Sequence, residues 1–245
     1  MKKCIILFLL MSQWLFSLAQ QSERDNAIAA LKHVTQTYLS TPYLSFDISY
    51  YYATQAKPDT YLDSLMGGFK MNGNQYWYSL DSMETMTDSV NVVVLYKQDQ
   101  VMYLSNNSGQ QQKGNPVTLL DSLLSVNRAL HFTYVQGSTQ DQIALFFPGK
   151  SEYKSITYFI DRSSGFLVKT ISLVKTAQMY ATDLQTQLNN VNGFSIIETR
   201  FSNYHANSFG SNVFNTSRYY TKQNNSYTVA AGYSSYQIFL GKPGM

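Results

Sequence analysis

The feature that most constrains this fold is a run of alternating side chains between residues 67 and 105. The letters FKM lead to Asn72-Gly73, a pair that suits the positive φ angles of a tight hairpin turn. Alternation resumes in YWYSL and returns in VNVVVLY and VMYLS. β-branched and aromatic residues with a period of two are typical of strands with one buried face. The stretch predicts consecutive antiparallel strands, with a polar connection at residues 81–89.

The first 19 residues have the pattern of a Sec-type signal peptide. Lys2 and Lys3 precede an apolar run at residues 4–16, and Ser17-Leu18-Ala19 supplies the small residues wanted before a cleavage site. The apolar run is shorter than the ~20 residues that a membrane-spanning helix needs. We therefore expect export to the periplasm, cleavage near Ala19, and no integral membrane span.

Cysteine and charge exclude several classes of function. Cys4, the only cysteine, lies inside the signal peptide, so the mature chain is predicted to have no disulfide and no thiolate ligand or nucleophile. The formal charge of +3 falls to about +1 without Lys2 and Lys3, and no basic cluster remains. Nucleic acid is therefore not an expected partner.

Helices are predicted before the strands and between them. Apolar residues at positions 27–38 predict an amphipathic helix of about four turns that ends at Thr41-Pro42. Asn115-Pro116 opens a second predicted helix, and a third, short one is expected at residues 181–188. Strands are predicted at residues 46–52, 132–136, 143–147, 155–160, 166–174, 194–201, 217–221, 227–231 and 236–240, and residues 56–65 are predicted to be a polar connection containing Pro58.

This order of elements predicts an α+β fold. The expected architecture is a curved antiparallel sheet with two or three helices covering its concave face, because an apolar sheet face must be buried against something. About 225 mature residues suffice for one large β domain. We predict a single domain over residues 20–245.

No catalytic or metal site is recognisable. The three histidines, His33, His131 and His205, lack the spacing of metal ligands. There is no G-x-S-x-G elbow and no glycine-rich phosphate loop. Neither an enzyme activity nor a cofactor nor a metal is therefore expected.

The abundant aromatic residues allow two interpretations. Tyrosine is common on the solvated face of a sheet, which explains such residues without any ligand. Alternatively, a wall of aromatic rings stacks sugars or holds acyl chains. The residues concerned are Tyr50, Tyr51, Tyr52, Tyr76, Trp77 and Tyr78.

A second short pattern is Asp-Ser followed by an apolar residue. It is similar to the acceptor sequence of a general periplasmic O-glycosylation system of some Gram-negative bacteria, although Asp and Ser also favour turns. Ser64, Ser82 and Ser89, expected in loops, are the candidate sites, whereas Ser122 falls within the second predicted helix.

The layout resembles the outer-membrane lipoprotein carrier (LolA-like) superfamily. The resemblance rests on the signal peptide, the amphipathic first helix, the run GFKMNGNQYWY and the hairpin at residues 156–171, and it covers residues 23–174. The section after Lys175 is longer and richer in Asn and Tyr than a carrier needs. The resemblance implies an unclosed β-barrel with helices as a lid over an apolar cavity.

That cavity implies a set of ligand-binding residues. The ligand would be a lipid or the acyl chain of a lipoprotein, with envelope membrane proteins as further partners. The implied wall consists of Phe46, Ile48, Tyr50, Phe69, Met71, Tyr76, Tyr78, Val92 and Val94, and the implied lid of Leu31, Val34, Leu120, Leu123 and Leu124.

Three functions remain open at this point. The leading hypothesis is a non-catalytic periplasmic protein that buries a lipid or another apolar ligand. The second is an interaction module that scaffolds a cell-envelope assembly, with the same sheet filled by its own side chains. A glycan-cleaving enzyme is third, because its two carboxylates can lie far apart in sequence.

Overall fold

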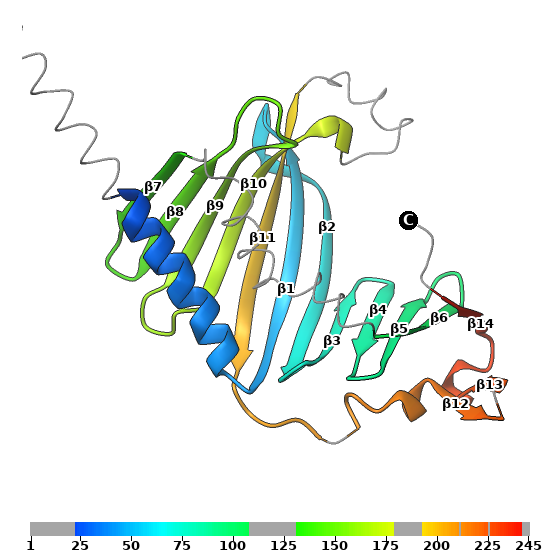
Figure 1. The fold of residues 1–245 in the computed structure, drawn as a ribbon. Coiled ribbons are helices and arrows are strands. Elements are labelled where there is room, and N and C mark those ends of the chain that lie inside the picture. The colour runs from blue at the N-terminus through cyan, green and yellow to red at the C-terminus, as the bar shows by residue number, and fades with distance from the viewer. Residues whose placement is uncertain (1–22, 108–130, 179–192, 211, 225, 242–245) are drawn as a thin grey trace, which may run out of the picture. The chain divides into compact units, whose positions relative to one another are not determined.

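The computed structural model describes residues 23–107, 131–178, 193–210, 212–224 and 226–241. One α-helix, at residues 23–40, precedes the strands, and short 3-10 helices interrupt the C-terminal part. The strands, drawn in Figure 1, are β1 (Tyr43–Thr54), β2 (Lys57–Asn72), β3 (Gln75–Leu80), β4 (Met83–Thr87), β5 (Asn91–Tyr96), β6 (Val101–Asn106), β7 (His131–Gln136), β8 (Gln140–Phe146), β9 (Tyr153–Asp161), β10 (Leu167–Lys175), β11 (Phe194–His205), β12 (Tyr220–Gln223), β13 (Ser226–Val229) and β14 (Gln237–Leu240). The 3-10 helices are η2 (Thr176–Gln178), η3 (Thr216–Arg218) and η4 (Ala231–Tyr233).

Twelve of these strands form one sheet, in the order β14-β6-β5-β4-β3-β2-β1-β11-β10-β9-β8-β7. The two end strands do not pair with each other, so the sheet is unclosed. Neighbouring strands from β2 to β6 and from β7 to β10 are antiparallel, whereas β14 runs parallel to β6. The predicted α+β class with an unclosed antiparallel sheet is confirmed.

The described chain divides into two compact units. Unit 1 contains the described residues of Met1–Thr37, Tyr52–Leu62 and Leu120–Glu198, and therefore most of the helix with β7 to β10. Unit 2 contains those of Tyr38–Tyr51, Asp63–Leu119 and Thr199–Met245, and therefore β3 to β6 with β12 to β14.

In unit 1 the predicted amphipathic helix is confirmed. Ala27, Leu31 and Val34, one stripe of the helix, are fully buried. The helix packs against the turn between β9 and β10, where a Cβ on Gly165 would lie 2.8 Å from Thr37 Oγ1 and 3.3 Å from His33 Nε2. Gly165 also has a φ of +74°, which L side chains rarely adopt. Glycine is thus required here both by the backbone and by the space.

In unit 2 the central hairpins follow the predicted alternation. Asn72 pairs with Gln75, so β2 and β3 are joined by a tight turn, and Asn91 to Tyr96 pair with β6 in continuous register.

Two segments predicted as connections are strands instead. Residues 57–65 belong to β2, although almost all of them are exposed, because a strand without a buried face carries no apolar alternation. Residues 83–87 form β4. Its sequence METMT shows no alternation of apolar and polar residues, because the buried positions are occupied by a glutamate, Glu84, as well as by Met86.

The C-terminal segment departs most from expectation. Residues 217–219 lie in or beside η3 rather than in a strand, and β12 begins only at Tyr220. The second and third predicted helices, at residues 115–130 and 181–188, and the signal peptide lie outside the described residues. No helix in the described ranges is both long and apolar enough to cross a membrane.

Candidate functional site

One face of unit 2, which we call the tyrosine face, carries most of the predicted wall residues. Strand register places Phe69 opposite Tyr78, and Val94 opposite Tyr103, with Thr85 between Tyr78 and Val94. Because directly paired residues point to the same side of a sheet, these five side chains form one row across β2 to β6. A second row on the same face contains Met71, Tyr76, Thr87 and Val92.

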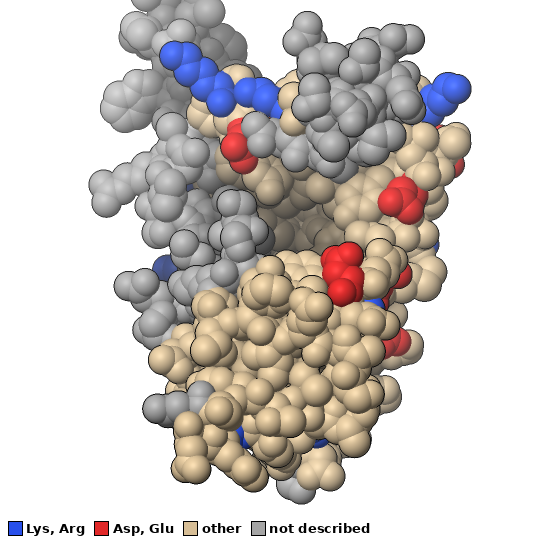
Figure 2. Space-filling model, turned by 90° about the vertical axis from the view of Figure 1, so that its right-hand side faces the viewer, with Lys and Arg blue, Asp and Glu red and all other residues tan. Residues whose placement is uncertain are grey.

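Burial falls along the first row. Phe69 is only 2% exposed, Tyr78, Val94 and Tyr103 are half-buried, and Phe239 of β14, which stacks on Tyr103 at 5.4 Å between ring centroids, is 44% exposed. Besides Thr85, the row consists of aromatic and aliphatic side chains, and Tyr78 and Tyr103 each add one hydroxyl group. The tyrosine face is therefore most accessible at the β6–β14 edge. Figure 2 looks at that side of the molecule: the lower part of the view is almost entirely uncharged, whereas acidic side chains lie at the centre and along the right margin.

At the other end of the row, the predicted wall residues pack against aromatic rings of the chain itself. Phe46 lies 5.1 Å from Phe69 and 4.9 Å from Tyr204, measured between ring centroids. The hydroxyl groups of Tyr38 and Tyr204 are 2.7 Å apart, and burial together with this contact raises the pKa of Tyr204. Native side chains thus occupy the space beside Phe46, where an open cavity was expected.

The remaining predicted residues divide between described and undescribed parts of the chain. Ile48 is buried and Tyr50 half-buried in β1, and Leu31 and Val34 are buried on the helix. Leu120, Leu123 and Leu124 lie outside the described residues.

The opposite face of β3 to β6 is closed by the C-terminal segment. Met86, Val93, Leu95, Met102 and Leu104 form a buried cluster with Tyr219 and Tyr220, and Trp77, Tyr227, Val229, Tyr233, Tyr236 and Ile238 pack against it. Sequence reasoning missed this core. Alternation in residues 92–95 is incomplete because both faces of β5 carry apolar residues, which is the one signal that could have revealed it.

A buried carboxylate lies in that core. Glu84 Oε1 accepts hydrogen bonds from Trp77 Nε1 at 2.9 Å and from the Tyr219 hydroxyl at 2.7 Å, and Glu84 Oε2 pairs with Lys97 Nζ at 2.9 Å. Burial raises the pKa of Glu84, but the three donors outweigh burial and leave the pKa below its ordinary value. The carboxylate therefore remains charged and fixes the indole of Trp77.

Unit 2 also contains an open groove of about 520 Å³ on the Trp77 side of β2 and β3. Gly67 and Gly68 contribute only backbone there. The other lining residues are polar or aromatic: Ser45, Phe46, Asp47, Phe69, Lys70, Trp77, Ser79, Asn203 and His205.

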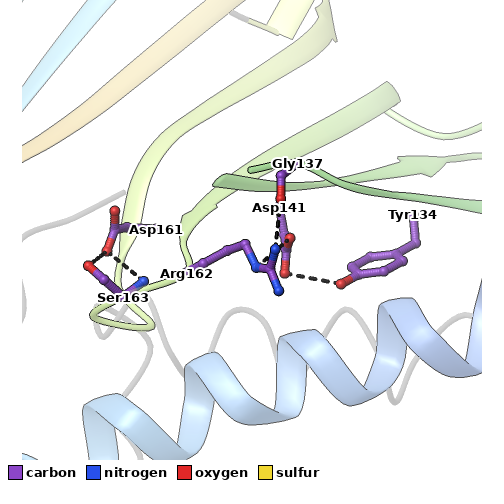
Figure 3. Close-up of polar contacts among 6 residues, drawn as sticks. All are labelled: Tyr134, Gly137, Asp141, Asp161, Arg162 and Ser163. Carbon is purple, nitrogen blue, oxygen red and sulfur yellow. Dashed lines mark hydrogen bonds and ion pairs between the residues drawn. The ribbon is translucent and has the colours of Figure 1, made fainter. Parts of the chain in front are cut away.

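Unit 1 has a second hollow, of about 370 Å³, between the helix and the ends of β7 to β9. Its polar wall is drawn in Figure 3: the Tyr134 hydroxyl donates to Asp141 Oδ2 at 3.0 Å, and Arg162 Nε lies 3.5 Å from Asp141 Oδ1. Arg162 also donates to the carbonyl of Gly137 at 2.8 Å. These contacts join the turn after β7 to the turn after β9, so a structural role accounts for them.

The adjoining turn is held by Asp161. Its Oδ1 accepts hydrogen bonds from the backbone and hydroxyl groups of Ser163 and Ser164, at 2.6 to 3.1 Å. Hydrogen bonds from Ser163 and then Ser164 hold the pKa of Asp161 below its ordinary value. This is an Asx-type turn.

The other candidate positions are scattered. His33 lies on the helix, His131 on β7 and His205 at the end of β11, and the described residues contain no group of three or more side chains suited to a metal ion.

Ser64 is exposed on β2 rather than in a loop, Ser89 is exposed in the turn before β5, and Ser82 is half-buried in the turn before β4. O-glycosylation of these serines stays a prediction.

Comparisons with known proteins give structural matches only. No family model and no curated protein matches the chain. An uncharacterised conserved protein from Thermus thermophilus matches with 7% identity and a TM-score of 0.45, over 76% of this chain and 90% of that one. A LolA superfamily protein from Nitrosomonas europaea matches with 10% identity and a TM-score of 0.35, over 77% and 97%.

A third match is the MucA/MucB complex of Pseudomonas aeruginosa. It has 10% identity and a TM-score of 0.40, over 84% of this chain and 63% of that one. No conclusion about activity, ligand or partner follows from similarity at this level. The matched structures do include a member of the LolA superfamily, the family that the sequence resembles.

Proposed function

We propose that this chain is a non-catalytic periplasmic carrier that binds a lipid or a lipoprotein acyl chain on the tyrosine face. The observation that carries the proposal is the row Phe69, Tyr78, Val94, Tyr103 and Phe239, whose exposure increases toward one edge while the opposite sheet face is closed by its own core. A half-exposed apolar row is unfavourable in water unless something covers it.

An acyl chain is a suitable cover on energetic grounds. Burying a methylene group gains ~0.8 kcal/mol, so a chain of roughly ten methylenes along the row gains several kcal/mol even after ordering costs. In this proposal the predicted residues Phe69, Met71, Tyr76, Tyr78, Val92 and Val94 form the wall of the binding face.

Half-buried positions provide the sharpest test. Val94→Asp places a charge in the middle of the row, whereas Val90→Asp makes the same chemical change at a turn position that is already 60% exposed. Ile48→Asp is unsuitable, because Ile48 is buried and the variant would lose its fold. We expect wild type and Val90→Asp to copurify with the same lipid, and Val94→Asp to lose it.

The measurement is mass spectrometry of an organic extract of the purified protein, with circular dichroism as the check on folding. Lipid-free wild-type protein that also takes up no fatty acid from added oleate would overturn the proposal. Equal lipid content in a folded Val94→Asp variant would overturn the assignment of the face.

A second candidate function is an interaction or scaffold component of a cell-envelope assembly, without a small ligand. The observation that favours it is the exposure of Phe239 and Leu240, at 44% and 65%, on the end strand of the sheet. Apolar side chains on an exposed edge strand suit pairing with another protein. A lipid-free wild-type protein that forms a stable complex lost in Phe239→Ser would support this function over the carrier.

A further inference from the structure

The groove at Gly67 and Gly68 opens on the side of β2 and β3 to which Trp77 and Ser79 point, opposite the tyrosine face, and Phe69 of the first row also borders it. Gly68 pairs with Ser79 and Lys70 with Trp77, and strand residues one position apart face opposite sides. The two faces of the same hairpin thus differ in chemistry. One is apolar, and the other carries a groove of about 520 Å³ that is lined by polar side chains and the indole of Trp77, with Phe46 and Phe69 also at its border.

An acidic side chain in the groove is held in a fixed orientation. Asn203 Nδ2 donates to Asp47 Oδ2 at 2.7 Å. Asn203 has a φ of +54° within strand β11, a left-handed conformation that is costly for a residue with a side chain. Asparagine adopts this conformation more readily than most side chains do, and its amide is the group that orients Asp47.

The indole of Trp77 is held by a hydrogen bond on the side away from the groove. Glu84 accepts from Trp77 Nε1 inside the buried core, so the indole keeps one orientation where it borders the groove. Lys70 Nζ lies 5.0 Å from the centroid of the Trp77 ring. An indole that is already ordered loses little conformational freedom when a ligand packs on it.

The two glycines have different reasons to be there. A Cβ on Gly67 would overlap the carbonyl group of Ser79, so the backbone requires glycine. A Cβ on Gly68 would have its nearest neighbour, Trp77 Cζ3, at 3.6 Å, which is ordinary contact, and Gly68 has no positive φ. The fold therefore accepts a side chain at position 68, and its absence leaves the groove open beside the indole.

From these contacts we infer that the groove binds a neutral sugar ring. Sugar hydroxyls donate to Asp47, accept from Lys70, and do both with Ser79 and His205, while the C–H groups of the ring pack on the indole. Asp47 and Lys70 balance each other in charge. Asp47 would repel an anionic ligand, and Lys70 would repel a cationic one. An acyl chain would remove water from both charged groups without replacing their hydrogen bonds, which is unfavourable.

The chain has two tryptophans, and Trp14 lies in the predicted signal peptide, so in the protein cleaved near Ala19 Trp77 is the only indole and a direct reporter of the groove. Fluorescence of this chain is titrated with maltotriose, cellotriose and triacetylchitotriose. We expect a saturable change with at least one of these trisaccharides. The absence of a saturable change with all three overturns the inference.

Variants then test the geometry. Gly68→Val fills the groove and is expected to weaken binding at least tenfold, and Gly68→Ala less. Asn203→Gly relieves the left-handed backbone and frees Asp47, so its unfolding temperature is expected to stay or rise while its affinity falls. Asn203 is thus a positioning residue.

Tyr78→Asp changes the tyrosine face and is expected to leave sugar binding intact, which separates this inference from the carrier proposal. Unchanged affinity in folded Gly68→Val would overturn the groove as the site, whatever the outcome of the lipid experiment.

Discussion

At the scale of single residues, Glu84 is the buried charge of unit 2 that contacts three separate parts of the chain. Its side chain is 9% exposed, and its three donors come from β3, from the turn after β5 and from the C-terminal segment. A buried carboxylate is costly unless its oxygens are satisfied, and here both are. One side chain therefore links sequence-distant parts of unit 2 and orders Trp77 beside the groove.

Glu84→Gln is expected to change how stability depends on pH. The folded pKa lies below the ordinary value of 4.5, so the charged form stabilises the fold above that pH, and this contribution is lost as the pH falls through the folded pKa. The variant should lose about 1–3 kcal/mol at pH 7. Between pH 7 and pH 3 its stability should fall less than that of wild type.

Urea unfolding across this pH range measures both effects, with the exposed Glu152→Gln as the matched control. Parallel pH profiles for wild type and Glu84→Gln would contradict the assignment.

At the scale of elements, alternation in the sequence predicts the strands that have one buried face and misses those that do not. The hairpins around Asn72 and around residues 161–165 are confirmed, as is the first helix. The outer half of β2 is exposed on both sides, and β4 carries a buried glutamate, so neither has the expected pattern. Patterns within one segment report local burial, and these exceptions are set by distant contacts.

The candidate sites divide in the same way. The resemblance places Phe69, Tyr78 and Val94 in one wall, and the strand register puts them on one face, while their role in binding stays a prediction. The groove could not be predicted, because Asp47 and Asn203 approach each other only through the fold. The packing of Tyr219 on Glu84 was equally hidden in the sequence.

The packing of the helix on the β9–β10 turn gives a prediction for unit 1. Gly165→Ala adds a Cβ at a positive φ and against Thr37, so we expect a loss of about 2–4 kcal/mol in the free energy of unfolding. Gly149→Ala is the control, since its Cβ meets nothing within 4 Å. Chemical denaturation measures both. Equal stability of the two variants would mean that the helix does not depend on this contact.

At the scale of the whole molecule, an open sheet has two edges, and β14 covers one side of β6. The pairing is parallel, with Gln237 opposite Val101, and the Gln237 N–H donates to the carbonyl of Gln100 at 2.9 Å. Without β14, the backbone groups along that edge of β6 are left to pair with another chain. The single-domain assignment of residues 20–245 stays a prediction beside the two compact units.

Gln237→Pro removes this N–H and is expected to loosen β14 and increase self-association. Gln237→Thr keeps the N–H and serves as the control. Light scattering at several protein concentrations distinguishes them. A monomeric Gln237→Pro variant with unchanged proteolytic resistance at its C-terminal segment would show that β14 does not protect the sheet.

The position of β14 in the chain has a consequence for biosynthesis. Its partner β6 is made early, whereas β14 emerges from the ribosome only after β7 to β13. The β6 border therefore stays unprotected during translation, and a holdase that masks extended backbone should raise the yield of the native product. Slowing synthesis late in the message would lengthen that vulnerable interval.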